Sequence, residues 1–576
     1  MIAKDRWELD SFFNEEKADK ALNKLQNKLI KLKKSSPKID ELILTLQEQD
    51  KLYKELESYI ICLMSENTKN KAGTSLFAKS MDVGQHINDC FTLLDNELKK
   101  LSSITPLLKN PKLKALKFFL TEKKEIASKK LSQDKEEIIN ALQPDGFHGL
   151  MTMYDHLKNQ ISIPSYDTKE PLSYPEAENC LSNPNRHVRR HTHQALTEAF
   201  EKQEDLFGEV LNHIAGFRLK TYELRGWNDF LEEPLTLNRI SKQTLNTMFS
   251  SIDNKKKGLL KFMEAKAKLL HIDKLSWYDL EAPISELERS YTFSEGAQLI
   301  LEVFGKYSEK LQDFALKALS SNWVEAEERK NKRAGGFCTS FPLSNQTRIF
   351  MNYKGTFDNV TTLAHELGHS FHADVTFDLD LFNQDYPMNL AETASTMCEQ
   401  MLLDSMTTNS MSKKEKLLLF DKKVSRHATY LMNLPARFYF ETSFYEERKK
   451  GFVEPSKITE LMVSAQNKAF DNALDELAPQ FWASKMHFYF TDYPFYNFPY
   501  TFGYLFSLGT YLILMDDPKS FEKRYIDLLK DTGRMTTEDL AKKHLGVDLK
   551  KPKFFERALA QVQSDIDTYL QLASSA

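Results

Sequence analysis

Hydrophobic residues recur along most of the chain with the period of an α-helix. Between residues 39 and 63 they fall mostly three or four positions apart and would line one face: Ile39, Leu42, Ile43, Leu46, Tyr53, Leu56, Tyr59, Ile60 and Leu63. A single stripe of this kind is typical of an amphipathic helix that packs on one side. Another helical run starts at NPNRHVRRHTHQ, from residue 183. We therefore expect a mostly α-helical protein.

One segment departs from this pattern. AGGFCTSFPLSNQTRIFMNYKG, residues 334–355, has paired glycines followed by alternation, which would place Ile349, Met351 and Tyr353 on one strand face. A short sheet is expected here, directly before a histidine-rich motif. Its edge could bind an extended peptide through unpaired N–H and C=O groups, or the segment could be a small structural hairpin. The sequence supports both interpretations equally.

Composition agrees with a helical fold, and the chain length indicates how many lobes it has. The chain has 576 residues, of which only 19 are glycine and 19 proline, so it is poor in turn residues. Single hydrophobic cores stop growing at roughly 250–300 residues. We expect two lobes or one elaborated unit.

Charge and cysteine content narrow the class of protein. The formal net charge is −4, which gives no reason to expect nucleic acid or an anionic membrane as a partner, and the basic run from Asn185 to Gln194 is expected to be a solvated helix face. No apolar signal segment or 18-residue apolar run is present. The five scattered cysteines fit reduced thiols, so we expect a soluble, cytoplasmic protein.

The motif HELGHSFH, residues 365–372, carries the candidate chemistry. On a helix, His365 and His369 lie one turn apart and can reach a single metal ion, while Glu366 points toward whatever the metal binds. His372 would fill the coordination position that catalysis needs open, so we interpret it as a supporting or structural residue. Gly368 costs about 1 kcal/mol relative to alanine within a helix, which indicates close approach of another backbone or a ligand.

Two histidines leave a zinc ion one protein ligand short. The helical run NLAETASTMCEQM, from Asn389, offers Glu392 as a third ligand and Glu399, seven residues later on the same face, as an acceptor for a ligand imidazole N–H. Small residues at 391, 394 and 395 would let this helix pack closely. From the residues alone, both glutamates could equally be ordinary surface side chains.

HELGHSFH followed by LAETASTMCEQ resembles the thimet oligopeptidase (M3) family of zinc peptidases, especially its oligoendopeptidase F branch. RAGGFCTSFP, IFMNYKG and MHFYFTDYPFYNFPYTFGYLFSLG (residues 486–509) extend the similarity over roughly residues 185–570. The resemblance implies a helical, two-lobed fold with an enclosed channel, divided into an N-terminal lobe (1–184) and a catalytic region (185–576). It also implies one zinc ion held by His365, His369 and Glu392.

The segment at residues 486–509 supplies candidates for stabilising the oxyanion of a peptide-cleavage intermediate. They are His487, Tyr496, Tyr500 and Tyr504; the resemblance favours these roles, whereas an aromatic core would account for the same residues. Pro499 and the tyrosine spacing differ from the thimet-type pattern, so individual tyrosines are assigned less securely than the metal ligands.

These residues predict a zinc-dependent oligoendopeptidase that acts on short, unfolded oligopeptides, with Glu366 as general base. A zinc carboxypeptidase of related helical fold and a catalytically silent peptide-binding protein are the alternatives. The intact set of ligands and base argues against the silent protein, because a silent relative does not need Glu366.

Overall fold

The computed structural model describes residues 4–35, 37–285, 290–407 and 411–575. Contacts divide the chain into two compact units: a first unit of residues 1–130, 288–406 and 510–546, and a second unit of residues 131–287, 407–509 and 547–576. Each unit thus collects segments that are far apart in the sequence. The division expected from the sequence was a single cut after residue 184, whereas these units are each built from several segments. The position at which the catalytic region begins stays a prediction.

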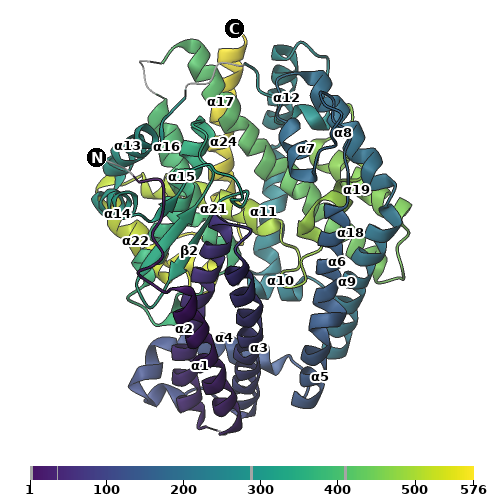
Figure 1. Cartoon of the computed structure of the whole chain (residues 1–576). Helices are drawn as coiled ribbons and strands as arrows, with labels where there is room; N and C mark the ends of the chain where they lie inside the picture. Colours follow the sequence, from purple (N-terminus) through teal and green to yellow (C-terminus); the bar gives the residue numbers. More distant parts are fainter. Residues whose placement is uncertain (1–3, 36, 286–289, 408–410, 576) are drawn as a thin grey trace. The chain divides into compact units, whose positions relative to one another are not determined.

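The first unit combines helices with one small sheet (Figure 1). Its elements are α1 (Glu15–Lys34), α2 (Ile39–Glu66), α3 (Lys71–Lys100), η1 (Leu107–Lys109), η2 (Pro111–Leu116), α4 (Lys117–Ser128), α13 (Phe293–Tyr307), α14 (Glu309–Ser320), β1 (Val324–Glu325), β2 (Phe337–Phe341), β3 (Gln346–Phe350), α15 (Phe357–Thr376), η5 (Leu381–Asn383), α16 (Met388–Met406), η8 (Pro518–Ser520), α22 (Phe521–Asp531) and α23 (Thr537–Leu545).

The regular elements described in the second unit are all helices, besides one isolated β-bridge between Ile163 and Leu172. Its elements are α5 (Gln133–Gln143), η3 (Pro144–His148), α6 (Gly149–Asn159), α7 (Tyr174–Cys180), α8 (Arg186–Glu201), α9 (Glu204–Arg225), α10 (Glu232–Leu237), α11 (Lys242–Lys255), α12 (Lys257–Leu269), η4 (Trp277–Asp279), α17 (Lys413–Ala428), η6 (Thr429–Asn433), α18 (Leu434–Arg448), α19 (Pro455–Phe470), α20 (Phe481–Ser484), η7 (Met486–Phe488) and α24 (Lys553–Ala573). The unit boundary falls within α21 (Phe498–Leu514).

These elements confirm the mostly helical fold and the short sheet beside the histidine motif. The predicted amphipathic stripe forms α2, and its leucines and isoleucines are buried in a core shared with α1 and α3. Phe341 of β2 and Phe350 of β3 belong to the same core. The N-terminal helices therefore support the sheet, and the sheet in turn packs against α15.

The sheet has the strand order β1-β3-β2, with β1 parallel and β2 antiparallel to β3. The strand predicted to run to Tyr353 ends earlier, at Phe350. Beyond that point Met351 N–H donates to the carbonyl of Glu325 and Tyr353 N–H to that of Ala326, so the chain still follows the segment around β1. β2 is left as an edge strand of this sheet.

The basic run on α8 differs from the solvated face expected for it. Arg189 is only 1% exposed and forms an ion pair of 2.8 Å with the buried Asp279, which Arg186 also contacts at 2.9 Å. The expectation was wrong for Arg189, because its partner comes from a segment 90 residues away. Within the described residues, no helix is both long and apolar enough to cross a bilayer.

Candidate metal centre

The helix α15 carries His365, Glu366 and His369. Its start is fixed by a capping box, in which the Thr356 side chain accepts from Asn359 N–H and the Asn359 side chain accepts from the backbone N–H of Thr356. An apolar stripe then anchors the helix: Val360, Leu363, Ala364, Leu367 and Phe371 are all buried. Because that face of α15 is packed against the core, His365 and His369 project together from a different face of the helix.

α16 brings Glu392 to these histidines by lying very close to α15. A Cβ on Gly368 would stand 2.6 Å from the Ser395 Cα and 2.7 Å from the Ala394 carbonyl oxygen. The expected close approach is therefore to the backbone of α16. Ser395 also donates its hydroxyl to Glu392 Oε2 at 2.9 Å, which holds the carboxylate in place.

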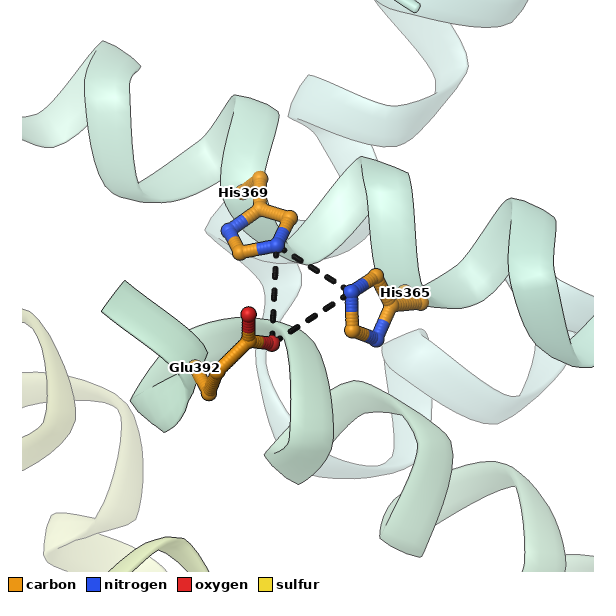
Figure 2. Close-up of side chains that lie close together, drawn as sticks. All are labelled: His365, His369 and Glu392. Atoms are coloured by element: carbon orange, nitrogen blue, oxygen red, sulfur yellow. Dashed lines mark hydrogen bonds and ion pairs between the residues drawn. The ribbon is translucent and has the colours of Figure 1, made fainter. Parts of the chain in front are cut away.

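The three side chains point toward one another, as Figure 2 shows. His365 Nε2 lies 3.1 Å from His369 Nε2 and 3.4 Å from Glu392 Oε2, and His369 Nε2 lies 3.7 Å from the same oxygen. Ligands about 2.0–2.1 Å from a tetrahedral zinc ion stand about 3.3–3.4 Å apart. Two nitrogens and one carboxylate oxygen at these separations fit one zinc ion and leave a coordination position for water or substrate.

The His369 imidazole is in the form that can bind a metal ion. Burial lowers the pKa of His369 to about 4 despite the nearby Glu392, so this ring is neutral near pH 7. His365 Nδ1 lies 2.5 Å from Glu399 Oε1. A carboxylate can only accept, so we assign the proton to Nδ1, which turns the Nε2 lone pair toward the metal position. The contact expected of Glu399 is present.

Glu366 lies beside the three ligands and is 6% exposed. Burial, followed by the charge of Glu392, raises its pKa to about 7 against the opposing effect of His365. Its Oε2 is buried and has no hydrogen-bond partner in the described part of the chain. Gly336, directly before β2, borders this carboxyl, since a Cβ there would lie 3.5 Å from Glu366 Oε1. This carboxyl is poised to exchange a proton with a bound molecule.

His372 turns away from the metal ligands. Its Nε2 contacts Thr532 Oγ1 at 2.9 Å and the Leu529 carbonyl at 3.3 Å, both at the end of α22. Its ring stacks flat on Tyr386, with centroids 4.0 Å apart. The structural interpretation of His372 agrees with these contacts.

The other candidate residues lie in the second unit. His487, in η7, has its ring centroid 5.1 Å from that of Tyr496 and 6.3 Å from that of Tyr500. Tyr500 donates to the Tyr496 hydroxyl at 3.4 Å. Both tyrosines are partly exposed, and the structure brings these three side chains into one cluster.

Two polar neighbours fix the His487 ring. Its Nδ1 lies 2.9 Å from Asn497 Oδ1, an oxygen that Arg437 also approaches at 3.4 Å. Burial, followed by the positive charge of Arg437, lowers the pKa of His487 to about 4. Nδ1 also lies 3.3 Å from Arg437 Nη1, so the neutral ring faces both polar neighbours with this one nitrogen.

Tyr504 has different surroundings. It is 3% exposed, its ring stacks on Tyr430 at 4.4 Å, and its hydroxyl makes a short contact with His427 Nδ1. The opposite nitrogen of His427 lies 3.0 Å from Asp565 Oδ2. Because that carboxylate accepts the Nε2 proton, the Tyr504 hydroxyl donates to Nδ1 and its proton is engaged within the unit.

A model of the family described as peptidase family M3 matches residues 179–561. The chain belongs to peptidase family M3. This confirms the resemblance carried by HELGHSFH and LAETASTMCEQ.

Relatives in peptidase family M3 include the chromosomal oligoendopeptidase F of Lactococcus lactis, 26% identical over 66% of this chain and 63% of that protein, so this match spans less than two thirds of the relative's length. Oligopeptidase PepF of Bacillus subtilis is 23% identical over 99% of this chain and 87% of its own. The crystal structure of oligoendopeptidase-F from Enterococcus faecium has the same fold, with a TM-score of 0.74 at 18% identity over 97% of this chain and 99% of that one.

Sequence reasoning missed three contributors to these two clusters. Gly336 borders Glu366, while Asn497 and Arg437 contact the His487 ring. The paired glycines before β2 were a usable signal for the first. The sequence contains no signal for Arg437, because this residue contacts His487, which lies 50 residues further along the chain.

Proposed function

We propose that this member of peptidase family M3 is a zinc-dependent oligoendopeptidase that hydrolyses internal bonds of short, unfolded peptides. The observation that carries the proposal is the set formed by His365, His369 and Glu392, whose ligand atoms all lie within 4.8 Å of one another, with the unpartnered Glu366 carboxyl beside it. Relatives named oligoendopeptidase F support the substrate class.

The three ligands would hold one Zn²⁺, which supplies Lewis acidity toward water and the scissile carbonyl. Glu366 Oε2 would accept a proton from the attacking water and deliver it to the leaving amine nitrogen as the C–N bond breaks. Burial raises the pKa of the Glu366 carboxyl and so increases its basicity toward that proton. General acid–base catalysis of this kind typically contributes about 10²–10⁴-fold.

The cluster in the second unit would act on the peptide rather than on the metal. Tyr496 and Tyr500 carry partly exposed hydroxyls that can donate to a developing oxyanion or to substrate carbonyls. His487, as a neutral ring, can form a hydrogen bond to the peptide through its Nε2. Tyr504 is better placed to position its neighbours, because its hydroxyl proton is engaged by His427.

The sheet offers a second surface for the peptide. β2 is the edge strand nearest the Glu366 carboxyl, since Gly336 directly precedes it. An extended substrate could add to this edge through backbone hydrogen bonds, which would be independent of its side chains. We also propose a cytoplasmic location, which the five free cysteines support.

Digestion of a defined peptide mixture tests the proposal. The zinc-loaded protein should cut internal bonds, and a chelator should abolish cleavage until zinc is restored. Mass spectrometry of the products separates the alternatives: release of single C-terminal residues would indicate a carboxypeptidase. Absence of any cleavage by fully zinc-loaded protein would favour a silent peptide-binding protein.

A further inference from the structure

Arg437 of α18 is a largely enclosed arginine in the second unit. Its Nε donates to Asn433 Oδ1 at 2.9 Å, its Nη1 reaches Asn497 Oδ1 at 3.4 Å, and its guanidinium lies over the Phe481 ring at 5.1 Å. These groups, together with the neutral His487 ring, whose Nδ1 lies 3.3 Å from Nη1, fix the orientation of the guanidinium. None of them neutralises its charge.

Among the described residues, no carboxylate lies within ion-pair distance of Arg437, and its Nη2 donates to no described group. Burial lowers the pKa of this guanidinium to about 10 despite the more distant Glu178 and Glu281. Arg225 of the same unit shows the usual arrangement: its side chain is 12% exposed and pairs with Glu136 at 2.7 Å. A desolvated arginine normally has such a partner.

Two lysines lie in the neighbourhood of Arg437 and His487. Lys485 and Lys158, with Arg437, all act on His487 to lower its pKa. The nearest acidic group, Glu178, is already engaged by Lys485 and by the Tyr174 hydroxyl at 2.7 Å. An anionic group that entered here would meet a cation with a free, preoriented N–H donor.

We propose that Arg437 binds the C-terminal carboxylate of the peptide substrate, with Tyr500 and His487 beside it. The inference rests on the proposed peptidase function, which makes peptides the available anions. Every short peptide carries a terminal carboxylate whatever its sequence, so one arginine could anchor substrates of varied composition. A planar guanidinium with open donors matches a carboxylate in shape and charge.

The test compares one peptide as free acid and as C-terminal amide. The zinc-loaded wild-type protein should cleave the acid with a KM about tenfold lower than that of the amide. Arg437→Gln should raise the KM of the acid about tenfold more than that of the amide, so that the preference for the acid is lost. Arg225→Gln, the matched control, should keep the wild-type ratio of acid to amide even if it lowers the melting temperature.

Binding provides a readout that needs no turnover. In the Glu366→Gln background, fluorescence anisotropy of a labelled intact peptide should show the same preference for the acid, and Arg437→Gln should remove it. Arg437→Lys, which keeps the charge without the planar fork, should restore part of it. These binding measurements test Arg437 even if the wild-type protein cleaves neither peptide. A lack of cleavage would count against the proposed peptidase function and not against the role of Arg437.

Equal KM and equal binding of acid and amide by the wild-type protein would overturn the inference, and this comparison needs no variant to fold. A third arm uses amidated peptides that differ only by Asp or Asn within the sequence. If the Arg437→Gln effect followed the aspartate and not the terminus, the subsite would recognise acidic side chains and the assignment to the C-terminus would be wrong.

Discussion

Gly368 of α15 lies directly against Ser395 of α16, with room for no side-chain atom between the glycine and the Ser395 Cα. The same two helices carry the histidine ligands and Glu392. The distance between the helices therefore sets the separation of Glu392 from His365 and His369.

Gly368→Ala should force α15 and α16 apart. We expect a loss of about 1–3 kcal/mol in the free energy of unfolding, as for other overpacked cores, together with weaker zinc binding as Glu392 moves away. Calorimetry and a competitive zinc titration measure both. Gly146→Ala is the matched control, because a Cβ there meets nothing within 4 Å. Unchanged zinc affinity in Gly368→Ala would separate helix packing from metal binding.

Glu399→Gln should weaken zinc binding about 10–100-fold without unfolding the protein, as is typical when the acceptor behind a ligand histidine is lost. The amide can still accept from His365 Nδ1 but carries no charge, so the ligand nitrogen becomes less basic. Glu302→Gln, on an exposed α13 surface, controls for loss of a carboxylate. If the two variants bound zinc equally, Glu399 would have no role in tuning the ligand.

The sequence contained the local part of this site and little of the rest. The spacing of His365, Glu366 and His369 is a property of one helix, so periodicity alone placed them on adjoining faces. Glu392 comes from another helix, and only the family resemblance made it a ligand. Gly368 was identified through its helix cost, although its contact with Ser395 could not be named.

Contacts between distant segments were beyond prediction. Arg189 seemed solvated because nothing in the basic run reveals Asp279, and Arg437 received no role because Asn497 lies 60 residues away. The tyrosines show the same limit: Tyr500 and Tyr504 are one turn apart, yet only the fold distinguishes a partly exposed hydroxyl from one engaged by His427.

The two tyrosines should consequently differ on substitution. Tyr500→Phe should lower kcat/KM about 10²–10³-fold, as when an oxyanion donor is removed, with little change in stability. Tyr504→Phe leaves His427 without its donor and should cost about 1–3 kcal/mol of stability. Steady-state kinetics and thermal melts on both variants check this. A larger kinetic loss in Tyr504→Phe at equal stability would reverse the assignment.

His372 should make the protein sensitive to acid. Burial, followed by the charge of His369, lowers its pKa to about 3, whereas an unfolded histidine titrates near 6.5. The unfolded state therefore binds the proton first, and stability is lost as pH falls below about 6.5, by about 2 kcal/mol at pH 5. His372→Gln should be less stable at neutral pH but should lose about 2 kcal/mol less than wild type on acidification.

Urea unfolding at both pH values, in the presence of chelator, measures this difference. The exposed His213 provides the control, since His213→Gln should follow the wild-type pH dependence. Parallel pH dependence of wild type and His372→Gln would contradict the assignment of a buried neutral ring.

The central claim is that His365, His369 and Glu392 hold a zinc ion for a reaction in which Glu366 moves the proton. Zinc content and peptide turnover of Glu366→Gln, measured on the same sample, test it most directly. The amide cannot accept a proton, so we expect one zinc ion per chain, as in wild type, and turnover reduced at least about 10²-fold. Turnover near the wild-type rate at full zinc occupancy would contradict the account.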